Sequence, residues 1–237
     1  MGNRLASVGH LVYAPDGHRR WASKSGISLF EVYAASVDVI IELIGWCFGK
    51  GGRVDELSLG VMAEYNLDRP MKDTAPLMDA FLMGASKVCG SRVVQELDIQ
   101  VDVVGELDVL FSKHSDEEKL HSALKKVNGH EGKKVHVLAP YNGNKELARA
   151  LTRCAETGQQ PTFEGLAKFW RIPKVDLYLR TGQAKGFVRI PQYLPGIEKA
   201  RLFGTPTYPQ DFTKKEFDRI IRDFLSLEDS YEKTSRK

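Results

Sequence analysis

The chain has 237 residues, of which 42% are apolar, and its formal net charge is +3. This size predicts one large domain over residues 1–237. The small charge excess excludes a typical nucleic-acid-binding protein, and no apolar run reaches the roughly 20 residues of a membrane span, so we expect no stable membrane anchor. Three widely separated cysteines and the absence of a leader-like N-terminus predict a cytoplasmic protein without disulfides.

Short apolar segments alternate with helical patterns, which is typical of an α/β fold with a mainly parallel sheet. The expected strands are residues 11–15, 57–62, 98–104, 135–138, 175–179 and 200–203. The expected helices are residues 28–48, which end at a run of glycines, 75–88 and 144–156. Thr213 and Glu216 have the spacing of a capping box that opens a C-terminal helix, and residues 228–237 are expected to form a flexible tail.

Arginines and small polar residues follow several of the predicted strands. In parallel sheets, ligands bind beyond the carboxyl ends of the strands, and these ends share one rim. The rim residues of interest are Asp16, Gly17, His18, Arg19 and Arg20 after the first strand, Asn66 and Arg69 after the second, and Arg180 after the fifth. Guanidinium groups meet phosphate with paired donors, so this rim predicts an anion site.

Single residues of this rim also have simpler interpretations. Asp16 follows Pro15 in a Pro-Asp-Gly sequence, which is a common turn signal. His18 could act as a general acid or base near neutral pH, or could simply occupy a loop that offers backbone donors. Arg19 points either into the site or to solvent.

Four segments together resemble the motifs of the cis-prenyltransferases, the undecaprenyl diphosphate synthase family. They are PDGHRRWA at 15–22, LGVMAEYNLDRP at 59–70, VDLYLRTGQA at 175–184 and YPQDF at 208–212. The resemblance implies a mostly parallel sheet of about six strands, flanked by helices, in a homodimer. It implies that an allylic diphosphate binds at the first segment with its chain in an apolar tunnel, while a second isoprenoid diphosphate binds at the RTG sequence.

The resemblance also implies a reaction and its residues. The allylic C–O bond ionises, the second substrate's double bond attacks, and Mg²⁺ held by an Asp and a distant Glu helps the diphosphate to leave. Asp16 would be the catalytic carboxylate and metal ligand, and Asn66 a second catalytic residue. The diphosphate-binding residues would be Gly17, His18, Arg19, Arg20, Arg69, Arg180, Arg189 and Arg201.

Several positions depart from the family's pattern. Tyr33 stands in place of a His, Ala63 and Tyr65 in place of a Ser and a Glu, and Arg201 in place of the distal magnesium-binding Glu. The Mg²⁺ dependence is therefore left open, and Arg201 could itself neutralise the diphosphate or Asp16.

These departures are similar to those of a lavandulyl-type branch, which joins two allylic diphosphates irregularly. We therefore expect an enzyme of specialised terpenoid metabolism that couples short allylic diphosphates irregularly, or ionises and cyclises one of them. One alternative is a conventional short-chain cis-prenyl elongase that uses isopentenyl diphosphate. The other is a non-catalytic partner subunit that binds a diphosphate.

Overall fold

A six-stranded sheet forms the centre of the computed structural model, which describes residues 7–113, 116–184 and 187–235. The strands are β1 (Val8–Ala14), β2 (Val54–Gly60), β3 (Gln100–Val104), β4 (Lys134–Leu138), β5 (Leu177–Arg180) and β6 (Arg201–Gly204). Their order is β3-β4-β2-β1-β5-β6, and every neighbouring pair is parallel. The predicted α/β fold with a six-stranded parallel sheet is confirmed. The homodimer stays a prediction.

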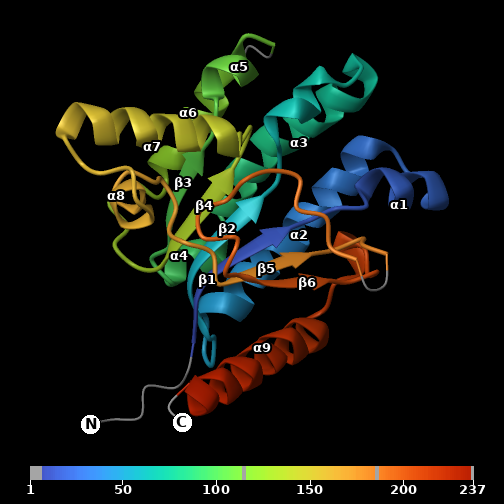
Figure 1. Cartoon of the computed structure of the whole chain (residues 1–237). Helices are drawn as coiled ribbons and strands as arrows, with labels where there is room; N and C mark the ends of the chain where they lie inside the picture. Colours follow the sequence, from blue (N-terminus) through green and yellow to red (C-terminus); the bar gives the residue numbers. More distant parts are fainter. Residues whose placement is uncertain (1–6, 114–115, 185–186, 236–237) are drawn as a thin grey trace.

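Helices surround this sheet on both sides (Figure 1). They are α1 (His18–Ser25), α2 (Leu29–Phe48), α3 (Met71–Cys89), α4 (Arg92–Glu96), α5 (Leu107–Phe111), α6 (Glu117–Lys125), α7 (Gly143–Thr157), α8 (Phe163–Ala167) and α9 (Lys214–Ser235). Two 3₁₀ turns, η1 (Glu64–Asp68) and η2 (Pro209–Asp211), precede α3 and α9.

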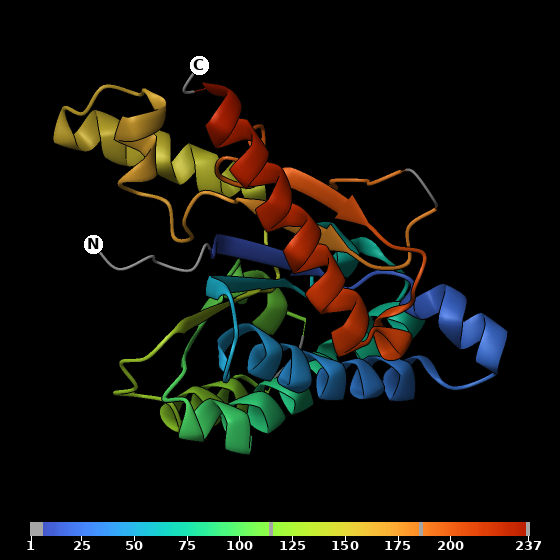
Figure 2. The same cartoon turned by 90° about the horizontal axis from the view of Figure 1, so that it is seen from below.

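The two faces of the sheet bury different sets of side chains. Leu11 and Tyr13 of β1 pack with apolar residues of α2 and α9, such as Ile44 and Phe217. Figure 2 shows α2 and α9 on this same face. Val12 and Ala14 point to the other face, where Tyr178 belongs to the same apolar cluster. Both faces of β1 are therefore buried, which explains why this strand has a continuous apolar run rather than an alternating one.

The long helix α2 matches its predicted limits because local signals mark both of its ends. Ser28 Oγ accepts a hydrogen bond from Glu31 N–H, and Glu31 Oε2 accepts one from Ser28 N–H, which completes a capping box. Gly49 follows the last residue at the C-cap. Helix α3 begins four residues before the predicted start at residue 75, since its first turn is polar and follows Pro70.

The C-terminal helix differs from its prediction in two details. Glu216 N–H donates to Thr213 Oγ1, which is one half of the predicted capping box. The Glu216 carboxylate instead accepts a hydrogen bond from Thr205 Oγ1 at 2.5 Å and so binds the loop after β6. Helix α9 continues to Ser235 and includes most of the segment expected to be a tail. Residues 236–237 lie outside the described residues, and the flexibility of this end stays a prediction.

Candidate functional site

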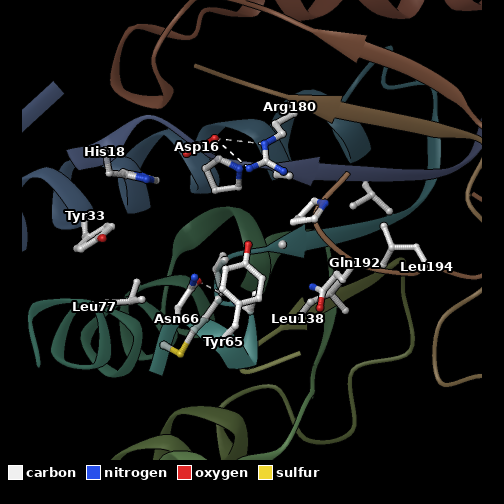
Figure 3. Close-up of a pocket in the computed structure, with 18 of the residues that line it drawn as sticks. Asp16, His18, Tyr33, Tyr65, Asn66, Leu77, Leu138, Arg180, Gln192 and Leu194 are labelled. Carbon is white, nitrogen blue, oxygen red and sulfur yellow. Dashed lines mark hydrogen bonds and ion pairs between the residues drawn. The ribbon is translucent and has the colours of Figure 1, made fainter. Parts of the chain in front are cut away.

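The carboxyl ends of β2, β1 and β5 lie side by side and open onto one cavity (Figure 3). Ala14 of β1 pairs with Arg180 of β5, so the segment after β1 begins level with the end of β5. The cavity measures about 810 Å³ including its open mouth. Its polar lining includes Asp16, His18, Arg19, Asn66, Arg69 and Arg180. The predicted convergence of three strand ends on one site is present in the fold.

The Asp16 carboxylate is the most heavily bonded group of this cavity. Its Oδ2 accepts hydrogen bonds from Arg180 Nη2 at 2.9 Å and Nε at 3.3 Å, and from Gln183 Nε2 at 3.1 Å. Its Oδ1 accepts from Gly17 N–H at 2.6 Å. Burial alone would raise the pKa of Asp16, but the Arg180 guanidinium outweighs it and holds that pKa below its usual value. Asp16 is therefore ionised at neutral pH.

Glycine is required where the PDG and RTG segments touch. Gly17 has φ +107°, and a Cβ there would lie 2.6 Å from the Tyr208 ring of the YPQDF segment. Gly182 has φ +63°, and a Cβ there would lie 2.3 Å from the carbonyl oxygen of Asp16. Both positions favour glycine for conformation as well as space. Close packing next to Asp16 therefore constrains residues in three of the four motif segments.

Helix α1 begins at His18, directly after the Pro-Asp-Gly turn. The sequence predicted the turn but not this helix. Its first backbone hydrogen bond runs from Trp21 N–H to the Gly17 carbonyl, so the N–H groups of His18, Arg19 and Arg20 precede the bonded part of the helix. Free N–H groups and the helix dipole make such an N-terminus favourable for an anion. Gly17, by contrast, donates its N–H to Asp16, so the donor role expected for it is already taken.

His18 and Tyr33 lie next to each other in the lining of the polar cavity (Figure 3). The His18 Nε2 is 3.0 Å from Ser36 Oγ, and its ring centroid is 4.9 Å from that of Tyr33. Burial lowers the pKa of His18 to about 4, against a smaller opposing effect of Asp16. The imidazole is therefore neutral near pH 7 and does not add positive charge to the site.

Arg19, Asn66 and Arg69 also line the cavity, whereas Arg20 lies beside it and approaches Asp16. Arg19 and Arg20 are more than half exposed, with Arg19 Nη1 at 3.7 Å from Asp73 and Arg20 Nη2 at 3.6 Å from Asp16. Arg69 and Asn66 line the cavity together with Asp16. The Asn66 Oδ1 accepts a hydrogen bond from Ala63 N–H, so this buried amide also fixes the turn that carries it.

Four of the predicted diphosphate ligands lie outside this cavity lining: Gly17, Arg20, Arg189 and Arg201. Arg189 is exposed, and it contacts the site through its backbone: its carbonyl accepts from Arg180 Nη1 at 2.7 Å, and its N–H donates to Gln183 Oε1. Arg201 lies on β6, where its Nε donates to Glu228 of α9 at 2.9 Å. The roles of Arg189 and Arg201 as diphosphate ligands stay predictions that this arrangement does not support.

Residues that the motif comparison passed over complete the site. Gln183 contacts Asp16 directly, Tyr178 OH accepts a hydrogen bond from Arg180 Nη1, and Ser36 pairs with His18. In the sequence, Gln183 is a polar residue after the fifth strand, where RTGQA departs from the family's RTGGE, but no role was assigned to it. Ser36 is far from the motifs in sequence, and only the packing of α2 against α1 brings it near.

An apolar cavity of about 750 Å³ adjoins the polar one between the sheet, α2 and α3. Both cavities share Pro15, His18, Tyr33, Val61, Met62 and Leu77, so they meet at these residues. The far end is lined by side chains that the polar cavity does not touch, including Val88, Cys89, Val101 and Leu124. A charged head group and a hydrocarbon chain could be bound together across this junction.

The donor set does not fit a metal ion held by two carboxylates. The described part of the chain has no group of three His, Cys, Asp or Glu side chains that could hold a metal. Both oxygens of Asp16 accept protein donors, and Arg201, which the sequence resemblance aligns with the family's second carboxylate, pairs with Glu228. Mg²⁺ is bound through carboxylate oxygens, phosphates and waters, and a directly paired guanidinium opposes it.

Fold and site together define a parallel α/β protein with an arginine-lined cavity that opens into an apolar one. Residues 14–232 match the Prenyltransf family model, which describes undecaprenyl diphosphate synthases. The chain therefore belongs to the undecaprenyl diphosphate synthase family of prenyltransferases, as the sequence resemblance predicted. Within the described residues, no helix has the length and hydropathy needed to span a bilayer.

Relatives match nearly the whole chain. A tritrans,polycis-undecaprenyl-diphosphate synthase (geranylgeranyl-diphosphate specific) of Pyrococcus abyssi is 27% identical, over 92% of this chain and 84% of its own length. An isoprenyl transferase of Campylobacter jejuni is also 27% identical, over 94% of this chain and 98% of its own.

Two solved structures share the fold. Lavandulyl diphosphate synthase from Lavandula x intermedia, in complex with dimethylallyl diphosphate, superimposes with a TM-score of 0.74 at 18% identity, covering 92% of this chain and 95% of its own. A probable undecaprenyl diphosphate synthase from C. jejuni gives 0.72 at 22% identity, covering 93% and 96%. At these identities the superpositions show the fold alone.

Proposed function

We propose that this protein is a cis-prenyl elongase, which adds isopentenyl diphosphate to an allylic diphosphate. The observation that carries the proposal is the direct junction of an arginine-lined cavity with an apolar cavity. The comparisons support this alternative better than the first expectation of irregular coupling. Relatives at 27% identity over nearly the full chain bear the names of undecaprenyl-diphosphate synthase and isoprenyl transferase, whereas the lavandulyl enzyme is similar only in fold.

The allylic diphosphate head would lie at the start of α1, near Arg19, Arg20 and Arg69, and the diphosphate of isopentenyl diphosphate would lie at the RTG sequence, near Arg180. Each charge-assisted hydrogen bond to a diphosphate is worth roughly 1.5–3 kcal/mol net. The hydrocarbon chain of the allylic substrate would extend past His18 and Tyr33 into the apolar cavity. Exclusion of water by this cavity strengthens the attraction between the guanidinium groups and the diphosphate.

The proposed reaction breaks one C–O bond and forms one C–C bond. The allylic C–O bond breaks, and its electron pair leaves on the diphosphate, which the arginines stabilise. The double bond of isopentenyl diphosphate attacks the allylic carbon to form the new C–C bond. The released diphosphate accepts the proton that is lost when a double bond forms again in the product. The sequence resemblance implied Mg²⁺ for the first step, but the donor set around Asp16 supports the arginines as the source of charge.

Product analysis tests the proposal. The purified chain is incubated with geranyl, farnesyl or geranylgeranyl diphosphate, with and without isopentenyl diphosphate, and products are identified by mass spectrometry. We expect products longer by five-carbon units only when isopentenyl diphosphate is present. Products from allylic diphosphate alone would instead support irregular coupling or cyclisation, and substrate binding without turnover would support a partner subunit. The predicted homodimer is checked separately by sedimentation.

A further inference from the structure

Gln183 is almost fully buried at the end of β5 and joins three parts of the site. Its Nε2 donates to Asp16 Oδ2 at 3.1 Å and to the Thr181 carbonyl at 3.0 Å. Its Oε1 accepts from Arg189 N–H at 3.3 Å. The residue is 9% exposed. All of its polar atoms are thus engaged, and one end of its amide is directed at the carboxylate.

Arg180 completes the enclosure of Asp16 from the same strand end. Two of its nitrogens donate to Asp16 Oδ2, and its third donates to the Arg189 carbonyl at 2.7 Å. Asp16 Oδ2 therefore receives three hydrogen bonds from Arg180 and Gln183, while Oδ1 accepts from Gly17. The carboxylate is used as a fixed acceptor that orients the guanidinium and the amide.

A glutamine at position 183 affects the charge next to Asp16 differently from a glutamate. An amide nitrogen next to Asp16 supplies a donor and no negative charge, so it stabilises the ionised carboxylate without attracting a cation. A glutamate there would place a second carboxylate about 3 Å from Asp16, and like charges so close favour a proton or a metal ion between them. The residue at 183 therefore selects between a site based on arginine and one based on a cation.

We propose that Gln183 is a positioning residue, which together with Arg180 keeps Asp16 within the protein's own hydrogen bonds so that the arginines bind the diphosphate without a divalent cation. The proposal rests on the proposed function, because it assigns the diphosphate to this cavity. It concerns how the charge of the diphosphate is neutralised, and it does not depend on which allylic chain is used.

Calorimetry on the full chain tests it with the unreactive thiolodiphosphate analogue of farnesyl diphosphate. Titrations are carried out in EDTA and in Mg²⁺. For the wild type we expect dissociation constants that agree within about twofold, a difference well below one hydrogen bond. For Gln183→Leu we expect binding about tenfold weaker in both buffers, since one charge-assisted contact to Asp16 is lost.

Gln183→Glu separates positioning of Asp16 from support of the neighbouring loop. The variant keeps an acceptor for Arg189 N–H but loses the donor to Asp16. We expect binding weaker than in Gln183→Leu in EDTA, and at least about tenfold tighter binding when Mg²⁺ is added, because two carboxylates now face each other. The control Gln159→Leu, exposed at the end of α7, should bind as the wild type does.

The outcomes discriminate between the two proposals. Wild-type binding that tightens tenfold or more with Mg²⁺ would overturn this inference and leave the proposed function intact. Gln183→Glu with wild-type affinity in EDTA, or without any gain from Mg²⁺, would also overturn it. Wild-type protein that binds the analogue in neither buffer would overturn the proposed function itself, together with the inference.

Discussion

At the scale of single residues, Asp16 gains its properties from groups that are distant in sequence. Arg180 and Gln183 are 164 and 167 residues away along the chain, yet both donate to the same carboxylate oxygen. Together they hold its pKa low despite partial burial. Arg201 shows the opposite case, since its motif position placed it near the diphosphate, whereas it pairs with Glu228 on α9.

Replacing Asp16 tests the residue that organises the site. Asp16→Ala should reduce the rate of product formation by about 100-fold or more, because Arg180 and Gln183 lose the acceptor that orients them at the diphosphate. Steady-state kinetics with farnesyl and isopentenyl diphosphates measure the effect. Asp218→Ala, which removes a surface carboxylate paired with Lys214, is the matched control and should retain the wild-type rate. A near-normal rate for Asp16→Ala would contradict the assigned role.

At the scale of elements, α2 and α3 pack together over the sheet and leave the apolar cavity between them. Gly84 of α3 belongs to this contact, because a Cβ there would lie 2.9 Å from Val37 of α2. The helices therefore approach closely at Gly84, while larger side chains on either side set the shape of the cavity. In the proposed binding mode, the far end of this cavity limits the length of the bound chain.

Filling that far end should shorten the product. Val88→Phe adds volume at a position of α3 that lines only the apolar cavity. We expect products with fewer isoprene units, and a stability loss of no more than about 1–3 kcal/mol from overpacking. Mass spectrometry measures product length, and calorimetry with the farnesyl analogue checks that the head-group site is intact. Products of unchanged length would show that the chain does not reach this end.

At the scale of the whole molecule, a second buried polar cluster lies on the sheet away from the site. His10 Nε2 is 2.8 Å from Ser58 Oγ, and His136 lies between Glu56 at 3.1 Å and Asp102 at 2.8 Å. Burial and then the charge of His136 lower the pKa of His10 to about 4. Burial alone would lower the pKa of His136, but Asp102 and Glu56 outweigh it and raise that pKa.

The two histidines give the stability of the protein opposite pH dependences. His10 is protonated less readily in the folded than in the unfolded chain, so its contribution is lost as pH falls from about 6.5 to about 4. His136 is protonated more readily when folded, so its contribution is present below about pH 6.5 and is lost as pH rises through its raised pKa.

His10→Gln isolates the first of these contributions. Between pH 7 and pH 4, the free energy of unfolding of the wild type should fall by about 3 kcal/mol more than that of the variant. Urea denaturation at several pH values measures it. His121→Gln, on the exposed surface of α6, should follow the wild type. Equal slopes for His10→Gln and the wild type would contradict the lowered pKa of His10.

The sequence by itself determined the order in which the six strands follow one another along the chain. It also determined the family to which the chain belongs. The apolar run of β1 and the capped pattern of α2 are local, and so are the glycines at 17 and 182, whose backbone φ values few other residues adopt. Short helices such as α4 and α8 have too few turns for a clear apolar periodicity, so they were not predicted.

Only the tertiary structure decided which charged groups meet. Arg180 and Arg201 are both arginines at strand positions of the same sheet, and no local pattern distinguishes the one that pairs with Asp16 from the one that pairs with Glu228. Gln183 and Ser36 entered the site through packing of segments remote in sequence. Electrostatic and hydrogen-bond partners depend on distances across the fold, whereas helix and strand patterns depend on neighbours along the chain.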